Sequence, residues 1–410
     1  MESPSHPIPS GLYAIPEHLL DLRPDSEIDH DLMNPEPVMG DKNIWFFWHS
    51  GYATMHPYAK RTVRAYHRRF SPQGWAIRVI DREASSPLNI ARFIDLTEAN
   101  FPQAFIEGTL TGRYAVQHTS DLVRWPLLLR YGGVYADVGM MQIGDLDRLY
   151  SKTVGDPDSP YEVLSYSSAS PERPGLTNYF LCSRRSNPLF LRCHRLMLAL
   201  WAEDGGKAST DGMHASPLLE GVLLQDTAGD VSFEEDGKIY GPDEIKVLLT
   251  DYIIQGQVMT QVMRLVDDEG GWNGPDYVAR HVYAIDFMEG SQLINVFTAW
   301  NGPWAFQLMS LPLPREGEEE SGDQKLAREI VEGCLQRSWG FKLAHGLILR
   351  VFGETLGSLW RKHEGSDVVP GTYAHWLRYA MVYWNQEKDP AKLDLKIVPL
   401  PKKGPLVREA

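Results

Sequence analysis

Cysteine, basic charge and long apolar runs are all scarce in this chain of 410 residues. The 3 cysteines are odd in number and lack C-x-x-C spacing, which argues against a disulfide scaffold and fits a reducing compartment. The formal net charge of −14 disfavours binding to nucleic acid or anionic membranes. No apolar run reaches the roughly 18 residues of a transmembrane helix, and the N-terminus lacks a secretory signal pattern. We therefore expect a cytoplasmic protein without a transmembrane segment.

Several familiar nucleotide-binding and catalytic motifs are missing as well. No G-x-G-x-x-G follows a predicted strand, which argues against a dinucleotide-dependent enzyme. A P-loop and an H-E-x-x-H motif are also absent. The strand and helix patterns of the chain therefore do not indicate any of these three kinds of site.

Short apolar runs alternate with helical patterns in the first half of the chain. Residues 43–51 and 75–81 are typical of buried strands, and residues 57–70 between them carry apolar side chains at helical spacing. A strand, a helix and a strand in this order form a right-handed βαβ unit. Another helix and strand follow within residues 118–139. We expect an α/β fold with a mainly parallel sheet flanked by helices and a helical C-terminal part.

The most informative stretch for function is HTSDLVRWPLLLRYGGVYADVG, residues 118–139, which contains two acids, an arginine and a glycine pair. Asp121 and Arg124 are three residues apart and share one face of the predicted helix. A glycine pair then permits a sharp turn into a strand, and Asp137 lies where that strand ends, at the edge where open α/β sheets bind ligands. Carboxylates and an arginine at this edge suit sugar hydroxyls and a phosphate. The structural alternative is a helix cap and a tight turn.

This stretch resembles the S-D-x-x-R … Y-G-G-x-Y-x-D-x-D core of the glycosyltransferase family 32 type sugar-binding region and of the capsular polysaccharide synthesis protein family. The segments NIWFFWHSG, TNYFLCSRRSNPLF and FKLAHG resemble further motifs of these families. The clear resemblance covers roughly residues 41–200. It implies a nucleotide-sugar-dependent glycosyltransferase of the GT-A fold, a Rossmann-like α/β architecture.

The resemblance also implies roles for individual residues. Asp121 and Arg124 would contact the donor sugar, and Asp137 would touch the donor and help to hold Mn²⁺ or Mg²⁺, so these three form the expected catalytic set. Trp48 would lie near the base, and Asn178 would face the transferred sugar. The full expected donor-binding set is Trp48, Ser120, Asp121, Arg124, Tyr135, Asp137 and Asn178.

Gly139 stands where the motif has its second aspartate, and this departure leaves three possibilities open. Asp137 could hold the metal with help from His345 of the FKLAHG segment, because imidazole is an acceptable Mn²⁺ ligand. Alternatively, no metal is held tightly and basic residues carry the phosphate charge. The third possibility is a non-catalytic GT-A-like module that binds a sugar nucleotide. Pro126 is a further departure, which predicts a helix that begins near Trp125 or kinks after Arg124.

The acceptor is predicted from the aromatic C-terminal part. Residues 373–384 carry an aromatic stripe along one helical face, and residues 297–306 add two tryptophans. Such stripes are usually core, and the functional alternative is a pocket for a small hydrophobic natural product, with an oligosaccharide or polysaccharide as the competing acceptor. By resemblance, we expect a hexosyl- or N-acetylhexosaminyltransferase that uses a UDP-sugar, or else GDP-mannose, and forms an α-linkage with retention.

Three regions follow from these patterns. Residues 1–40 are rich in proline and acids and predict an irregular N-terminal arm. The GT-A nucleotide-sugar-binding catalytic domain is expected to span residues 41–310. Residues 311–410 predict a helical region that completes the acceptor side of the site.

Overall fold

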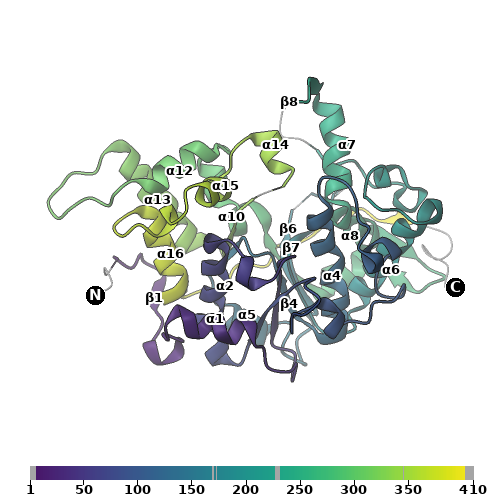
Figure 1. Ribbon diagram of the computed structural model, residues 1–410, viewed down its shortest axis with the longest axis horizontal. Coiled ribbons are helices and arrows are strands. Elements are labelled where there is room, and N and C mark those ends of the chain that lie inside the picture. The colour runs from purple at the N-terminus through teal and green to yellow at the C-terminus, as the bar shows by residue number, and fades with distance from the viewer. Residues whose placement is uncertain (1–5, 169, 172, 227–230, 345, 402–410) are drawn as a thin grey trace.

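A six-stranded sheet forms the centre of the protein, in the order β12-β6-β7-β4-β2-β3 (Figure 1). The computed structural model describes residues 6–168, 170–171, 173–226, 231–344 and 346–401. β7 runs antiparallel to both of its neighbours, and all other neighbouring strands in this sheet are parallel. The predicted α/β fold with a mainly parallel sheet is confirmed. The six strands are β2 (Asn43–Phe47), β3 (Ala76–Ile80), β4 (Gly133–Ala136), β6 (Val163–Ser167), β7 (Leu176–Ser183) and β12 (Val282–Asp286).

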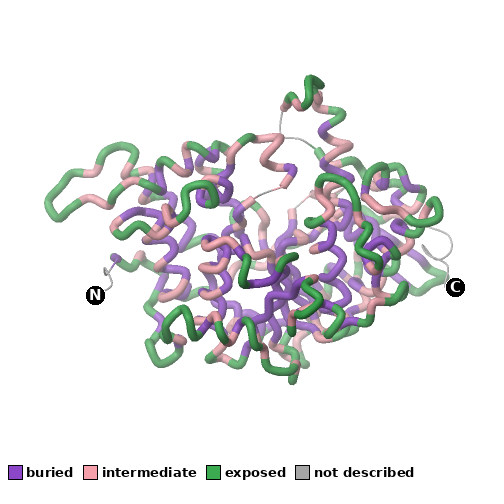
Figure 2. The backbone as a smooth tube through the Cα atoms, viewed as in Figure 1, coloured by how far each residue is buried: buried purple, intermediate pink, exposed green. Residues whose placement is uncertain are grey.

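Both faces of the sheet are covered, because alternate side chains of each strand enter different cores. In β2, Phe46 packs in one core with the helix α2 (Pro57–Phe70), whereas Trp45 packs in the other. That second core contains α4 (Ala115–Tyr131), α6 (Pro188–Ala202) and α8 (Ile254–Arg264), which lie on the far side of the sheet from α2 (Figure 1). Burial is accordingly highest along the central strands (Figure 2).

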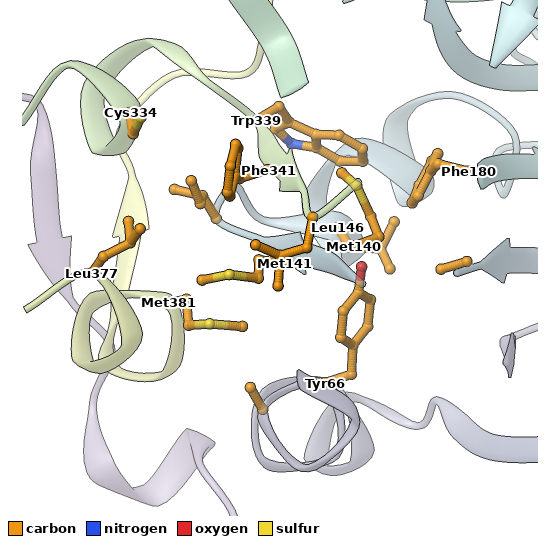
Figure 3. Packing of buried hydrophobic residues seen from close by; sticks show 14 of the residues in the cluster. Tyr66, Met140, Met141, Leu146, Phe180, Cys334, Trp339, Phe341, Leu377 and Met381 are labelled. Atoms are coloured by element: carbon orange, nitrogen blue, oxygen red, sulfur yellow. The ribbon is translucent and has the colours of Figure 1, made fainter. Parts of the chain in front are cut away.

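The C-terminal helices pack against the α2 side of the sheet. Two short strand pairs join them to the rest of the protein. β13 (Gly340–Lys342) pairs antiparallel with β5 (Met140–Gln142), and β14 (Trp384–Gln386) pairs with β1 (Leu12–Ala14). Figure 3 shows Met141 of β5 among apolar side chains from β13 and from α16 (Tyr373–Tyr383). The β5–β13 pairing brings the C-terminal region close to the carboxyl end of β4, because β5 follows shortly after that end.

The N-terminal arm is more regular than its composition predicts. Its described part contains β1 and the nine-residue helix α1 (Asp25–Met33). α1 buries Ile28 and Leu32, and its carboxylates pair with arginines of α2, for example Asp29 with Arg64 at 2.6 Å. The acids that suggested an irregular segment therefore serve as partners for basic side chains of α2.

The remaining elements complete the two sides of the sheet. All three cysteines, Cys182, Cys193 and Cys334, are buried and unpaired, in agreement with the expected lack of a disulfide scaffold. None of the helices in the described ranges combines the length and apolar character needed to cross a bilayer. The other helices and strands are α3 (Gln103–Glu107), α5 (Leu146–Lys152), α7 (Pro242–Tyr252), α9 (Gly274–His281), α10 (Phe287–Ser291), α11 (Leu293–Phe297), α12 (Gly302–Ser310), α13 (Gly322–Arg337), α14 (Ile348–Phe352), α15 (Leu356–Lys362), β8 (Phe233–Glu235), β9 (Lys238–Tyr240), β10 (Leu265–Asp267), β11 (Trp272–Asn273) and β15 (Leu400–Pro401).

Candidate active site

A cavity of about 750 Å³ opens at one edge of the central sheet. The carboxyl ends of β2 and β4 meet at this edge, and so does the amino end of the antiparallel strand β7. These strand ends, together with α4, α8 and parts of the C-terminal region, supply the wall. Six of the seven predicted donor-binding residues line it: Trp48, Ser120, Asp121, Arg124, Asp137 and Asn178.

The helix α4 carries three of these residues and differs from one of the two alternatives drawn from Pro126. It begins at Ala115 and runs through Pro126 to Tyr131, so a start near Trp125 is wrong. Tertiary burial outweighs the missing backbone N–H, because the residues on both sides of the proline are packed in the core. Asp121 and Arg124 therefore share one helical turn, as their spacing predicts.

Arg124 is the centre of a buried ionic cluster. Its guanidinium is 2.7 Å from Asp121 Oδ1 and 3.0 Å from Asp137 Oδ1, and it donates a hydrogen bond of 2.8 Å to Gln255 Oε1. Burial alone would lower the pKa of Arg124, but the carboxylates of Asp121 and Asp137 outweigh this effect and raise it. The guanidinium thus stays charged while it connects α4 to the end of β4.

Asp121 is held from several directions as well. Asn178 donates a hydrogen bond of 3.3 Å from Nδ2 to Asp121 Oδ1, and the His118 ring lies 3.3 Å from Oδ2. Thr210 contacts the other nitrogen of that ring at 3.1 Å. Asn178 lies on β7, so this bond fixes the helix against the amino end of the antiparallel strand. These contacts hold the carboxylate of Asp121 in place at the cavity wall.

Tyr135 lies behind the wall rather than on it. Its side chain is fully buried, and burial raises the pKa of its hydroxyl to about 12. The hydroxyl lies 2.8 Å from Ser120 Oγ, and the Arg124 guanidinium carbon lies 4.9 Å from the centre of the ring. Tyr135 therefore positions Ser120 and Arg124, whereas the other six predicted residues reach the cavity themselves.

Lys342 is a cavity residue that the sequence analysis missed. It ends β13, where it lies opposite Met140 of β5, and its Nζ is 2.6 Å from Asp137 Oδ2. The sequence could have indicated Lys342, because it belongs to the FKLAHG segment, of which only His345 was predicted to have a role. Asp137 consequently lies between two cations, Arg124 on one oxygen and Lys342 on the other.

The structure also explains the glycine at position 139. A Cβ atom added to Gly139 would lie 2.9 Å from the carbonyl oxygen of Leu343, closer than real Cβ contacts allow. The two residues are joined by a hydrogen bond of 2.8 Å from the Leu343 N–H to the Gly139 carbonyl. An aspartate here would have to displace the chain that follows β13, so the missing acid and the FKLAHG segment belong to one arrangement.

The described side chains do not by themselves fit a divalent ion. Such an ion needs several oxygen ligands, yet both Asp137 oxygens already contact cations and Asp121 is engaged by Arg124 and Asn178. In the part of the chain that the structure describes, no three His, Cys, Asp or Glu residues are grouped as a metal site. His345, the predicted second ligand, lies outside the described residues. The expectation of Mn²⁺ or Mg²⁺ therefore stays a prediction.

The aromatic stripe of α16 belongs to the core and not to the cavity wall. Tyr373 and Trp376 of α16, and Trp384 at the start of β14, are at most 3% exposed and belong to the same core as residues of α13 and β1. The pocket hypothesis for this stripe is wrong, because helical periodicity identifies an apolar face without identifying what that face meets. Trp300 does line the cavity, and Trp304 packs against the core. Apolar residues that do line the cavity include Val116, Leu223, Ile253, Phe287, Trp300 and Ile348.

Known proteins resemble this chain over most of its length. Residues 16–207 match the capsular polysaccharide synthesis protein family. The O-glycosyltransferase braB of Annulohypoxylon truncatum is 31% identical over 388 residues, which cover 93% of this chain and 89% of that protein. Glycosyltransferase afumC of Aspergillus fumigatus is 32% identical over 379 residues, with coverages of 91% and 93%. The O-glycosyltransferase PaGT of Phomopsis amygdali is 30% identical over 397 residues, with coverages of 94% and 93%.

These findings confirm the capsular part of the resemblance seen in the sequence. The similarity to the three relatives extends well beyond residue 207 and so includes the C-terminal helices. The chain therefore belongs to the capsular polysaccharide synthesis protein family, within a group of glycosyltransferases.

Proposed function

We propose that this protein transfers a hexosyl or N-acetylhexosaminyl group from a nucleotide sugar to a hydroxyl of a small hydrophobic natural product. The observation that carries the proposal is the cluster of Asp121, Arg124 and Asp137 on the wall of a cavity of about 750 Å³. Cavities of roughly 300–1,000 Å³ suit small-molecule ligands. The relatives named above are glycosyltransferases, two of them O-glycosyltransferases, which is the same class of reaction.

The donor is proposed to be a UDP-sugar bound in the GT-A manner, with the base near Trp48 and the transferred sugar near Asp121 and Asn178. Carboxylate oxygens accept hydrogen bonds from sugar hydroxyls, and the fork of Arg124 suits a phosphate. All four of these side chains line the same cavity, which supports a single continuous donor site. GDP-mannose is the competing donor.

The proposed step breaks the bond between the anomeric carbon and the β-phosphate oxygen, and the electron pair stays on that oxygen. The acceptor hydroxyl oxygen forms the new bond to the anomeric carbon, and its proton passes to the departing phosphate. Retention would follow if attack occurs on the face from which the phosphate leaves, giving an α-linkage. Positive charge fixed near the phosphate is the main help that a protein supplies in such a reaction.

The acceptor is proposed to be apolar because of the second part of the cavity lining. Val116 and Leu223 are 53% and 46% exposed, and both face this cavity. Trp300 also lines it and adopts a left-handed backbone conformation with φ of 61°, which is costly for a bulky residue. Because Trp300, Val116 and Leu223 line one cavity, they support an apolar ligand there.

Donor hydrolysis by the purified protein tests the first half of the proposal. A panel of UDP- and GDP-sugars should yield one preferred donor that is hydrolysed slowly without an acceptor. Apolar alcohols and oligosaccharides are then added separately as acceptors. The alcohols should form a glycosylated product, in competition with hydrolysis of the donor. Exclusive use of glycans would overturn the acceptor, and a β-anomeric coupling in the NMR spectrum of the product would overturn retention. Absence of hydrolysis together with tight donor binding would support the non-catalytic module.

A further inference from the structure

The ammonium of Lys342 lies close to the position where the motif has its second acid. Lys342 Nζ lies 3.7 Å from the position that a Cβ atom at Gly139 would take, and 2.6 Å from Asp137 Oδ2. Its side chain is 15% exposed, and the ammonium also lies 5.5 Å from the centre of the Tyr179 ring. The β5–β13 pairing holds its backbone, so the ammonium is directed to the cavity beside Asp137.

The charges around this point favour an anionic ligand without a divalent ion. Asp121 and Asp137 provide two negative charges, and Arg124 and Lys342 provide two positive ones, so the cluster is neutral. A carboxylate cluster that awaits a metal would instead carry excess negative charge. A nucleoside diphosphate bound at this neutral cluster would lie close to two cations, Arg124 and Lys342.

Lys342 and Arg124 differ in how easily they can turn to a ligand. Arg124 is 4% exposed and is held by Asp121, Asp137 and Gln255. The ammonium of Lys342 is a compact charge on a flexible stem with three donors. It can keep one hydrogen bond to Asp137 while it donates another to a phosphate oxygen.

We propose that Lys342 Nζ stabilises the departing diphosphate of the donor and takes the role that a metal held by a second acid would otherwise have. The inference rests on the proposed function. As the bond from the anomeric carbon to the β-phosphate oxygen breaks, the oxygen gains the electron pair, and Lys342 donates a hydrogen bond to that phosphate. Preorganised cationic donors of this kind gain strength as the negative charge develops.

The test uses the full chain and three variants: Lys342→Met, Lys342→Arg and, as a matched control, Lys42→Met. Lys42 forms a similar lysine–aspartate pair, with Nζ 2.5 Å from Asp147 Oδ1, but does not line the cavity. Binding of UDP and of GDP is measured by calorimetry in EDTA and in Mn²⁺. Bound Mn²⁺ is followed by electron paramagnetic resonance without any nucleotide, and donor hydrolysis is measured in parallel.

The wild type is expected to bind its nucleotide equally in EDTA and in Mn²⁺ and to leave the free Mn²⁺ signal unchanged. Lys342→Met should weaken nucleotide binding about tenfold or more and slow hydrolysis in EDTA by roughly 10²–10³-fold, the usual effect of losing one such donor. Lys342→Arg keeps the charge and should recover part of the binding. Lys42→Met should match the wild type.

Two results would overturn the inference and are distinguishable from failure of the proposed function. Nucleotide binding that requires Mn²⁺, with loss of the free-ion signal, would assign the charge to a metal. Unchanged binding and hydrolysis in a folded Lys342→Met variant would leave Lys342 with a structural role only. In contrast, a wild type that binds neither UDP nor GDP under any of these conditions would overturn the proposed function itself.

Discussion

Replacing Asp137 with asparagine separates the functional role of this carboxylate from its structural one. The substitution keeps the size of the side chain and one acceptor oxygen but removes the charge that Arg124 and Lys342 share. Arg124 retains Asp121 and Gln255 as partners, so the guanidinium is not left alone. The variant should therefore fold but lose the geometry of the proposed donor site.

The size of the effect on stability follows from burial. Removing one partner of a fully buried ion pair costs about 3–5 kcal/mol. The Asp137 side chain is 23% exposed and asparagine still accepts a hydrogen bond, so we expect a loss of about 1–2 kcal/mol, which is a few degrees in Tm. Donor hydrolysis should fall roughly 10²–10³-fold, whereas binding of free UDP should change less because UDP lacks the sugar.

Asp147→Asn is the matched control for this experiment. Asp147 also has a side chain that is 23% exposed and also contacts a lysine, at 2.5 Å, but it does not line the cavity. Both variants are compared by chemical denaturation and by donor hydrolysis. If Asp137→Asn keeps full hydrolysis, or loses activity only in proportion to a stability loss shared by Asp147→Asn, the assignment of Asp137 to the donor site is refuted.

Three further predictions concern Gly139, the proposed acceptor part of the cavity lining, and pH. Gly139→Asp should cost about 1–3 kcal/mol of stability, measured by denaturation, because its Cβ would meet the Leu343 carbonyl oxygen at 2.9 Å, and it should not create tight Mn²⁺ binding. Trp300→Ala should raise the KM for an apolar acceptor while donor hydrolysis stays constant, whereas Trp376→Ala should cost about 3–5 kcal/mol of stability; similar effects of both would contradict the assignment of the wall. Burial lowers the pKa of His194 to about 4, below its unfolded value of 6.5, so unfolding binds a proton and stability should fall as pH drops from about 6.5 towards 4. The free energy of unfolding at pH 5 should be about 2 kcal/mol lower than at pH 7. In a folded His194→Leu variant, the free energy of unfolding measured in urea should depend less on pH.

Local features of the site could be predicted from the sequence, because they depend on periodicity and on the ends of strands. The spacing of Asp121 and Arg124 places both on one helical face, and the described helix brings them within 2.7 Å. The position of Asp137 after an apolar strand predicted the edge of the sheet at which the cavity opens. Of the two alternatives drawn from Pro126, the helix start near Trp125 was wrong, because burial of the surrounding helix outweighs the local effect of the proline.

The sequence by itself determined the strand–helix–strand unit of residues 43–81, and it determined that Asp121, Arg124 and Asp137 reach the end of the sheet. Only the tertiary structure decided the partner of Asp137, because Lys342 is 205 residues away and arrives through the pairing of β13 with β5. It also decided that the α16 aromatics are core and that Trp300 faces the cavity. The physical reason is the same in each case: periodicity specifies a face, and packing between distant segments specifies what that face meets.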